Sequence, residues 1–418
     1  MDDKQKSKYF QYYRDYCFFK KIEVNRVEDL ARESLEKGFN DLYAFIMTLL
    51  CRYSLENQRR DNFCDYLSDL KIVANTEGGF PAVHAYINEG YYQMMVEQNY
   101  QNAIKYFQTA RNIYEEHSLH NPPTLFLIFQ YLGVSYWNIS DDIIAYKYFT
   151  EALKCNLNKT FRFHKAMTYN WLAIIETEHH LISQALEKSL RSAKILKNYA
   201  IEIRYCDVMN TIGLLYLDLK KFDDAKTAFT ESLKIALKHN VSFIIADAYN
   251  NIGLFYYRTN QPYLSIEQLQ KSIEHRNHET DQRKYGFTLM NLCCVYMFLE
   301  DFPMAEKYIF EAMKIAKKFD DTVFLTKCNL NVAMVYHKTK DYPKTKSFLS
   351  LCEQYALKAN NIDILIDIYK AYIDLYHDTK RYKKKKKYEI LYTEMLKKQD
   401  EMKQNNIKNF LEAISGKL

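Results

Sequence analysis

Two rows of asparagine, each with members forty residues apart, are the side chains in this sequence that are best suited to chemistry. The rows are Asn170, Asn210, Asn250 and Asn251, Asn291, Asn331. Asparagine is a poor residue for helix interiors, and its amide can both donate and accept hydrogen bonds. The rows could therefore bind the N–H and C=O groups of an extended peptide without reading its side chains. The alternative is that the amides stabilise the stacking of neighbouring repeats.

Other arrangements that support catalysis or metal binding are missing from the sequence. His179-His180 and the His275, His278 pair lack the carboxylate or cysteine neighbours of a metal site. There is no glycine loop that could hold phosphate, and no Ser/His/Asp or Cys/His arrangement. The 9 cysteines have no paired spacing and several occupy apolar helix positions, which favours reduced thiols in a cytosolic protein. We expect neither a metal nor a cofactor.

Small residues with the same forty-residue period indicate which elements would carry these side chains. The first row is Gly133, Ala173, Gly213, Gly253, Cys293 and Ala333. A second row, twelve residues further on, is Ala145, Ala185, Ala225, Ser265, Ala305 and Thr345. A third row, seven further, is Ala152, Ser192, Ser232, Ser272, Ala312 and Cys352. Antiparallel helices that cross closely require small side chains at the crossing, and Phe149, Phe229 and Leu269 would fill the adjoining gap.

The period is that of a helix pair, and it resembles a lengthened tetratricopeptide repeat. Short polar turns separate the two helices, and Pro262, Pro303 and Pro343 recur where the second helix would begin. Glycine (9) and proline (6) are scarce, which favours long helices. The sequence predicts an all-α fold with a right-handed superhelical solenoid of about seven to eight helix pairs. Weaker repeats would begin near Glu89 and end with Tyr372, Tyr376, Tyr382 and Tyr392.

Residues 8 to 72 do not fit this period, and they predict a separate three-helix bundle. The expected helices span Lys8–Lys20, Val27–Lys37 and Asp41 to about Leu70, with Asn40 as the N-cap of the third. The segment Thr76–Pro81 is the best candidate for a linker. We therefore expect a bundle at residues 1–75 and a repeat domain at residues 76–418.

The charge and hydropathy pattern favours a cytoplasmic binding protein. The net charge of +6 is too small to indicate nucleic-acid binding, and direct contact with nucleic acid is not expected. The run of five lysines at Lys383–Lys387 could attract an acidic partner, although such a run is more often the solvated side of a helix. The start of the chain lacks an apolar signal segment, and the longest apolar run, Leu42–Cys51, is too short to span a membrane.

A short bundle followed by a forty-residue repeat array resembles the Rap family of peptide-sensing bacterial regulators. The resemblance rests on residues 41–46 with Arg52, on residues 216–225 (YLDLKKFDDA), and on residues 249–253 (YNNIG). It implies that the bundle binds a response regulator, blocking its DNA binding or dephosphorylating it. It also implies that a short quorum-sensing peptide binds the concave side of the repeats and controls the protein. The target regulator, the peptide and the oligomeric state, a homodimer included, are left open.

The resemblance also assigns roles to individual residues. Asp218 and Asn251 match the Asp and Asn that hold the peptide backbone in the family, although Asp218 could instead pair locally with Lys220 or Lys221. Asn40 matches the glutamine of the phosphatase members, but it is one methylene shorter. Such a phosphatase would position water against an aspartyl phosphate on the regulator. A scaffold without catalysis and a peptide-receptor transcriptional regulator are the alternatives.

Overall fold

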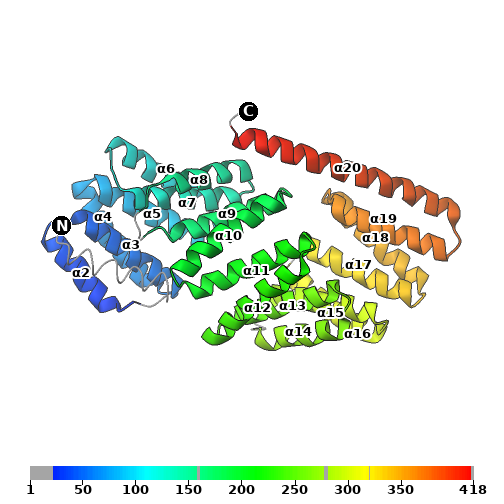
Figure 1. Ribbon diagram of the computed structural model, residues 1–418. Helices are drawn as coiled ribbons and strands as arrows, with labels where there is room; N and C mark the ends of the chain where they lie inside the picture. Colours follow the sequence, from blue (N-terminus) through cyan, green and yellow to red (C-terminus); the bar gives the residue numbers. More distant parts are fainter. Residues whose placement is uncertain (1–21, 158–160, 277–280, 320, 416–418) are drawn as a thin grey trace. The chain divides into compact units, whose positions relative to one another are not determined.

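Every regular element of the described chain is an α-helix. The computed structural model describes residues 22–157, 161–276, 281–319 and 321–415, and no strand occurs in these ranges (Figure 1). The contacts divide the protein into two compact units. The first comprises the described residues up to Ile175, Lys194–Ile201 and the described part of Glu412–Leu418, and the second comprises Glu176–Ala193 and Glu202–Leu411.

The helices of each unit follow one another along the chain as consecutive pairs. The first unit contains α2 (Val24–Glu36), α3 (Asn40–Glu56), α4 (Arg60–Glu77), α5 (Gly79–Met95), α6 (Tyr100–Glu116), α7 (Pro122–Asn138) and α8 (Asp142–Lys154). The helices α9 (His164–Glu178) and α10 (Ile182–Asn198) are divided between the units. The second unit contains α11 (Glu202–Asp218), α12 (Phe222–His239), α13 (Ser242–Arg258), α14 (Pro262–His275), α15 (Gln282–Phe298), α16 (Phe302–Lys318), α17 (Thr322–Lys338), α18 (Tyr342–Lys358), α19 (Ile362–Asp378) and nearly all of α20 (Tyr382–Ile414).

The predicted fold class, an all-α array of tetratricopeptide-type helix pairs, is confirmed. In the second unit the first helices of successive pairs, α11, α13, α15, α17 and α19, begin forty residues apart. Each of α11, α13, α15 and α17 packs against the second helix of its own pair and against the first helix of the next pair. The spacing of small residues in the sequence therefore reflects the length of one helix pair.

The small residues of the first row are required because a large side chain occupies the space beside them. A Cβ atom on Gly133 would lie 2.7 Å from the ring of Phe149, and one on Gly253 would lie 2.7 Å from Cγ of Leu269. Real Cβ atoms do not approach other atoms so closely. Unless Phe149 or Leu269 moves, these two positions can therefore hold only glycine. The predicted nesting of large residues against small ones is confirmed for these pairs.

The serines of the third row also bind the neighbouring helix through hydrogen bonds. Ser232 Oγ donates to the carbonyl of Cys206 at 3.0 Å, and Ser272 Oγ donates to the carbonyl of Ala246 at 2.8 Å. Each of these contacts joins a second helix to the first helix of the same pair. All four residues are fully buried, so the hydroxyl satisfies its own hydrogen-bonding needs while keeping the helices close.

The turns between the paired helices have the same backbone conformation in each repeat. One residue per turn has a left-handed φ near 60°, and these residues are Ser140, His180, Lys220, Asn260, Glu300, Lys340 and Lys380. The second helix then begins at once, with proline in the first turn of α14, α16 and α18. The predicted role of Pro262, Pro303 and Pro343 at helix starts is confirmed.

The amino-terminal segment differs from the prediction in its third helix. The first predicted helix, Lys8–Lys20, lies outside the described residues. The helix expected from Asp41 to about Leu70 is instead two helices, α3 and α4, because the chain turns at Gln58, which has φ 58°. The expected N-cap is also wrong, since α3 begins at Asn40 with Phe39 at the cap position and no capping side chain.

The forty-residue period extends further toward the amino terminus than the sequence indicated. The helices α3 and α4 pack against each other and both pack against α5, so no separate linker lies between them. Gly78, with φ 65°, is the residue between α4 and α5. The proposed domain boundary at residue 75 therefore falls within α4.

A buried polar network joins α3, α5 and α7. The ring of His84 accepts or donates one hydrogen bond at each nitrogen, to Thr48 Oγ1 at 2.9 Å and to Thr124 Oγ1 at 3.1 Å. Asn88 donates to Thr48 at 2.9 Å and to the carbonyl of His84 at 2.8 Å. His84 has no exposed surface, and burial together with the nearby charge of Arg52 lowers its pKa to about 3. The ring is therefore neutral at physiological pH.

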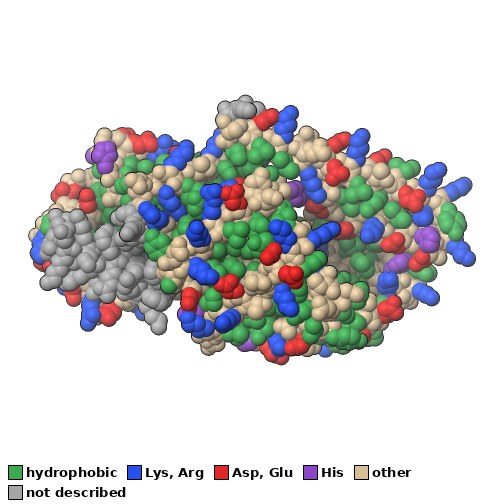
Figure 2. Space-filling model, viewed as in Figure 1, with side chains coloured by type: hydrophobic (Ala, Val, Ile, Leu, Met, Phe, Trp, Pro, Cys, Tyr) green, Lys and Arg blue, Asp and Glu red, His purple; other side chains and the backbone are tan. Residues whose placement is uncertain are grey.

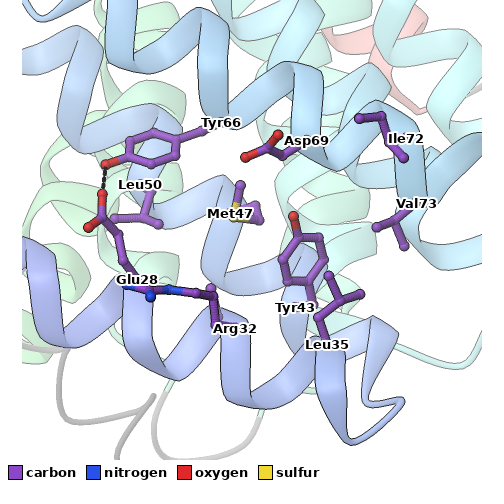
Figure 3. Close-up of a pocket in the computed structure, with 11 residues that line it drawn as sticks. Glu28, Arg32, Leu35, Tyr43, Met47, Leu50, Tyr66, Asp69, Ile72 and Val73 are labelled. Carbon is purple, nitrogen blue, oxygen red and sulfur yellow. Dashed lines mark hydrogen bonds between the residues drawn. The ribbon is translucent and has the colours of Figure 1, made fainter.

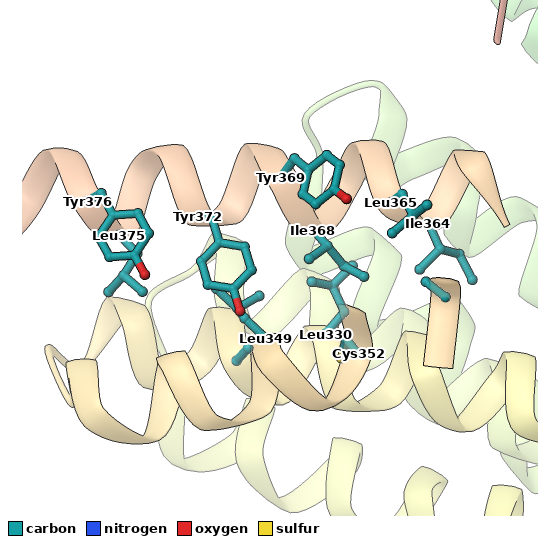
Figure 4. Packing of buried hydrophobic residues seen from close by; sticks show 12 residues of the cluster. Leu330, Leu349, Cys352, Ile364, Leu365, Ile368, Tyr369, Tyr372, Leu375 and Tyr376 are labelled. Atoms are coloured by element: carbon teal, nitrogen blue, oxygen red, sulfur yellow. The ribbon is translucent and has the colours of Figure 1, made fainter. Parts of the chain in front are cut away.

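The array ends in a cluster of tyrosines and aliphatic residues from α17, α18 and α19 (Figure 4). Residues of α20, among them Tyr388 and Tyr392, pack against this cluster. The ring centroid of Tyr388 on α20 lies 4.2 Å from that of Tyr372 and 5.6 Å from that of Tyr376. Tyr382 and most of the lysine run are exposed on the first turns of α20. On the face drawn in Figure 2, basic and acidic side chains are interspersed rather than segregated. These observations favour the solvated-helix interpretation of the run.

Candidate functional site

The exposed side of α11, α13, α15, α17 and α19, which we call the first-helix face, carries most of the polar residues predicted from the sequence. These helices are parallel members of the repeat, so residues forty apart lie at the same height on neighbouring helices. One row along this face is Asn210, Asn250, Met290, Leu330 and Lys370, and the adjacent row is Thr211, Asn251, Asn291, Asn331 and Ala371. The two asparagine rows are thus side by side on α13.

The amides on the first-helix face bridge neighbouring helices. Asn250 Oδ1 accepts hydrogen bonds from Asn291 Nδ2 and from Thr288 Oγ1, both at 3.1 Å. Asn331 Oδ1 accepts a weak bond from Cys294 Sγ at 3.8 Å. Asn250 Nδ2 also lies 3.4 Å from Asn251 Oδ1. The stacking interpretation therefore holds for Asn250, Asn291 and Asn331, and each half-buried amide keeps further hydrogen-bonding capacity.

Asn210 differs from the other members of its row because it is buried in α11. Only 8% of its surface is exposed, and its Oδ1 has no hydrogen-bond partner within the described part of the chain. A buried acceptor without a partner is costly. Its neighbour in the next repeat, Asn250, satisfies the equivalent oxygen through Thr288.

Asp218 pairs with the next repeat rather than with its own turn. Its Oδ1 lies 3.1 Å from Nη1 of Arg258, which is forty residues further on. The alternative of a local pair with Lys220 or Lys221 is therefore not observed. Both partners of the Asp218–Arg258 pair are about half exposed, so the pair is accessible at the end of α11 and α13. A surface pair of this kind contributes little to stability.

A cluster of charges near the start of the same helices was missed in the sequence. Arg276, whose side chain is buried, binds Asp247 at 2.8 Å and Asp281 at 2.6 Å, and Lys284 also binds Asp247 at 2.7 Å. Burial raises the pKa of Asp207 to about 6, and Asp247 adds to this effect while Arg204 opposes it. The forty-residue spacing of Asp207 and Asp247 was the signal that could have revealed the cluster.

A second candidate site is a pocket of about 370 Å³ between α2, α3 and α4. Tyr66 donates to Glu28 across it, and Tyr43 and Asp69 face each other near its centre (Figure 3). Leu35 and Ile72 are exposed at its edge. Burial and the nearby Asp69 raise the pKa of Tyr43 to about 12, so Tyr43 keeps its hydroxyl proton.

Asn40, the predicted catalytic residue, is half-buried in the first turn of α3, three residues before Tyr43, and does not line this pocket. In the described ranges, no group of three or more His, Cys, Asp or Glu is arranged to hold a metal ion. Within the same ranges, no helix combines the length and apolar character needed to cross a membrane.

Comparisons with known proteins agree with the geometry. The sequence profile of the tetratricopeptide repeat matches residues 207–239 and 246–276, which include most of α11 to α14. No curated protein sequence matches the chain. The structure is similar to the apo form of RapI, with a TM-score of 0.67 and 15% identity over 86% of this chain and 98% of that one. The chain has the Rap fold.

Two further solved structures with the Rap fold contain bound ligands. A Rap protein complexed with competence and sporulation factor has a TM-score of 0.61 and 15% identity over 88% of this chain and 99% of that one. The Rap conjugation gene regulator of plasmid pLS20, in complex with the Phr* peptide, has a TM-score of 0.52 and 15% identity over 79% of this chain and 97% of that one. The resemblance in fold that the sequence predicted is confirmed over nearly the full length of the chain.

Proposed function

We propose that this chain is a cytosolic signalling protein that binds a response regulator and is controlled by a short peptide. The observation that supports the proposal most strongly is the Rap fold, which a peptide-bound regulator shares. The first-helix face is a suitable place for the peptide, because half-buried amides follow one another from α13 to α17. An extended chain needs such paired donors and acceptors along its backbone.

In this proposal Asp218 and Asn251 anchor the peptide backbone, and the half-buried Asn250, Asn291 and Asn331 contribute along the same face. Asn210 was predicted to contribute as well, but it is buried in α11. Arg258 holds the Asp218 carboxylate at the edge of α13, where it can accept a peptide N–H while the ion pair stays formed. A carboxylate has about four lone-pair sites, so one arginine does not exhaust it.

Peptide binding should raise the thermal stability of the protein, because a ligand that binds only the folded state stabilises it. Hexapeptide pools are added to the purified chain, and the melting temperature is followed by fluorescence. The pools that stabilise the wild type should bind Asn251→Ala at least about ten-fold more weakly, because a hydrogen bond between the neutral amide and the peptide backbone is lost. The same loss of affinity is expected for Asp218→Ala. Asp223→Ala, an exposed carboxylate on α12, is the matched control and should behave as the wild type. A scaffold that senses nothing would be stabilised by no pool.

The bundle in this proposal engages the response regulator through α2, α3 and α4, with the pocket around Tyr43 as the apolar contact. Asn40 stands in the first turn of α3, near the same surface. Its amide could orient water toward an aspartyl phosphate, but it reaches one methylene less far than glutamine would.

We expect the chain to bind a phosphorylated response regulator without hastening its dephosphorylation. The measurement is phosphate release from the isolated regulator with and without the protein. Asn40→Gln should then increase the release rate if reach is the limitation, and Asn57→Gln, at the far end of α3, should not. Release by the unaltered chain that Asn40→Ala abolishes would instead make it a phosphatase.

A further inference from the structure

The helix pair α9–α10 has an ion pair at positions where other pairs have stacked aromatic rings. In three other pairs a tyrosine of the first helix stacks on an aromatic ring twelve residues further along the chain. These stacks are Tyr136–Tyr148, Tyr296–Tyr308 and Tyr336–Phe348, with ring centroids 5.5, 5.5 and 5.8 Å apart. The equivalent residues of α9 and α10 are Glu176 and Lys188, which form a salt bridge. A charged contact therefore replaces an apolar one in this pair.

A second polar residue of the same pair stands where other pairs have a large apolar side chain. The residues at this position in α8, α12, α14, α16 and α18 are Phe149, Phe229, Leu269, Ile309 and Leu349, all completely buried. In α10 the position is Ser189, which is also completely buried, and its hydroxyl has no hydrogen-bond partner among the described residues. Thr168 of α9 is buried in the same way, again without a partner in the described part of the chain. The interior of α9–α10 therefore holds polar groups where other pairs hold apolar volume.

Each of these replacements weakens the packing of α9 on α10. Burial of apolar surface is the main favourable term in folding, and a serine in place of phenylalanine or leucine contributes little of it. A buried hydroxyl without a partner is costly. Glu176 is only 2% exposed, and the cost of taking its charge out of water offsets much of the attraction to Lys188. In a repeat array each pair is coupled only to its neighbours, so one weak pair lowers the coupling across it.

The contacts of the chain divide at the same place. The boundary between the two compact units falls between Ile175 and Glu176 in α9 and between Ala193 and Lys194 in α10. The pairs from α3–α4 to α7–α8, and those from α11–α12 to α17–α18, each lie within one unit. The division depends on backbone contacts and not on residue type, so it points to α9–α10 independently of the polar side chains.

We propose that α9–α10 is a hinge of the repeat array, a pair that opens more readily than its neighbours and lets the array bend there. The inference does not depend on the proposed function, because it concerns the packing of the protein without a ligand. It goes beyond that function by placing a joint between its two parts. The amides from α13 to α17 belong to the second unit, whereas α2, α3 and α4 belong to the first.

The two tryptophans of the sequence make the hinge testable in the full chain without labels. Trp137 and Trp171 both belong to the first unit, so their fluorescence reports its unfolding, whereas far-ultraviolet circular dichroism reports the helices of both units. In urea the two signals should give different midpoints, because a weak pair uncouples the units. Amides of α9 and α10 should also exchange with deuterium at least about ten-fold faster than those of α7, α8, α11 and α12.

The variants test whether the polar residues cause this behaviour. Glu176→Tyr, Lys188→Phe and Ser189→Leu together reproduce the pair α17–α18, which has Tyr336, Phe348 and Leu349 at these positions and Ala333 where α9 has Ala173. The triple variant should bring the two midpoints together and slow exchange in α9 and α10 at least about ten-fold. Ser189→Ala, which removes only the hydroxyl without a partner, should slow this exchange in the same direction even if the triple variant does not fold. Ser183→Ala, at an exposed position on the same helix, is the matched control and should leave the exchange unchanged.

Two results would overturn the inference without touching the proposed function. One is a wild type whose midpoints coincide or whose α9 and α10 exchange as slowly as their neighbours. The other is a folded triple variant that keeps separate midpoints and rapid exchange in α9 and α10, because the polar residues would then not be the cause.

Discussion

Replacing Gly213 with alanine should destabilise the protein by about 2 kcal/mol, although alanine has a higher helix propensity than glycine. In a helix without obstruction, Gly→Ala stabilises by roughly 1 kcal/mol. Here the new Cβ atom would overlap the ring of Phe229, which is fully buried in α12 and has no room to retreat. Overpacking a core costs about 1–3 kcal/mol. The sign of the effect, read from urea unfolding, therefore reports the closeness of the two helices.

A second change should restore part of the loss. The double variant Gly213→Ala, Phe229→Leu has alanine on the first helix and leucine on the second. A later repeat already contains this pair at the same spacing, as Ala333 and Leu349. Phe229→Leu alone leaves a cavity and should cost roughly 1–2 kcal/mol. The double variant should be about as stable as Phe229→Leu alone, so the two effects would not add. Strict additivity would mean that residues 213 and 229 do not contact each other.

Lowering the pH from 7 to 4.5 should destabilise the first unit by about 3 kcal/mol through His84. The unfolded histidine has a pKa near 6.5, and the buried ring has a pKa of about 3. Between these values the unfolded state binds the extra proton, so the stability that the neutral ring provides is present above pH 6.5 and is lost as the pH falls toward 3. Charging the ring would also turn its one accepting nitrogen into a donor, so one of the hydrogen bonds to Thr48 and Thr124 would have to reverse its direction.

The histidine contribution can be separated from that of carboxylates by substitution. His84→Gln keeps hydrogen-bonding groups but does not titrate, so it should lower stability at pH 7 and flatten the dependence between pH 6.5 and 4.5. His120→Gln, at an exposed position, should leave the pH dependence as it is in the wild type. Chemical denaturation at each pH gives the free energies. An unchanged slope in His84→Gln would show that the ring is not buried as a neutral group.

The regular part of the fold could be predicted from the sequence because one physical requirement repeats. Each close helix crossing needs a small residue, and the recurrence of Gly213 and Gly253 at one spacing exposes the length of the pair. The break between α3 and α4 could not be predicted in this way. It occurs at Gln58, a residue with φ 58° that is neither glycine nor proline, so composition gives no signal there.

The candidate site was predicted in outline but not in its contacts. The spacing places Asp218 and Arg258 at one height, yet the preference of Asp218 for Arg258 over the nearby lysines depends on side-chain geometry. The buried network around His84 had a signal, because Thr48 and Asn88 are forty residues apart, but the large residues of α3 obscured the period. The cavity of about 610 Å³ that is lined mainly by α17 and α19 has no sequence signature, because its lining residues come from separate helices.

Hydrogen exchange with and without the most stabilising hexapeptide tests most directly whether the first-helix face binds a peptide. Amide protection is followed by mass spectrometry across the described helices, because bound elements open less often. The proposal predicts that protection increases in α13, α15 and α17, with smaller changes in the second helices α14 and α16. Protection that increases only in the second helices, or only in α2, α3 and α4, would contradict it.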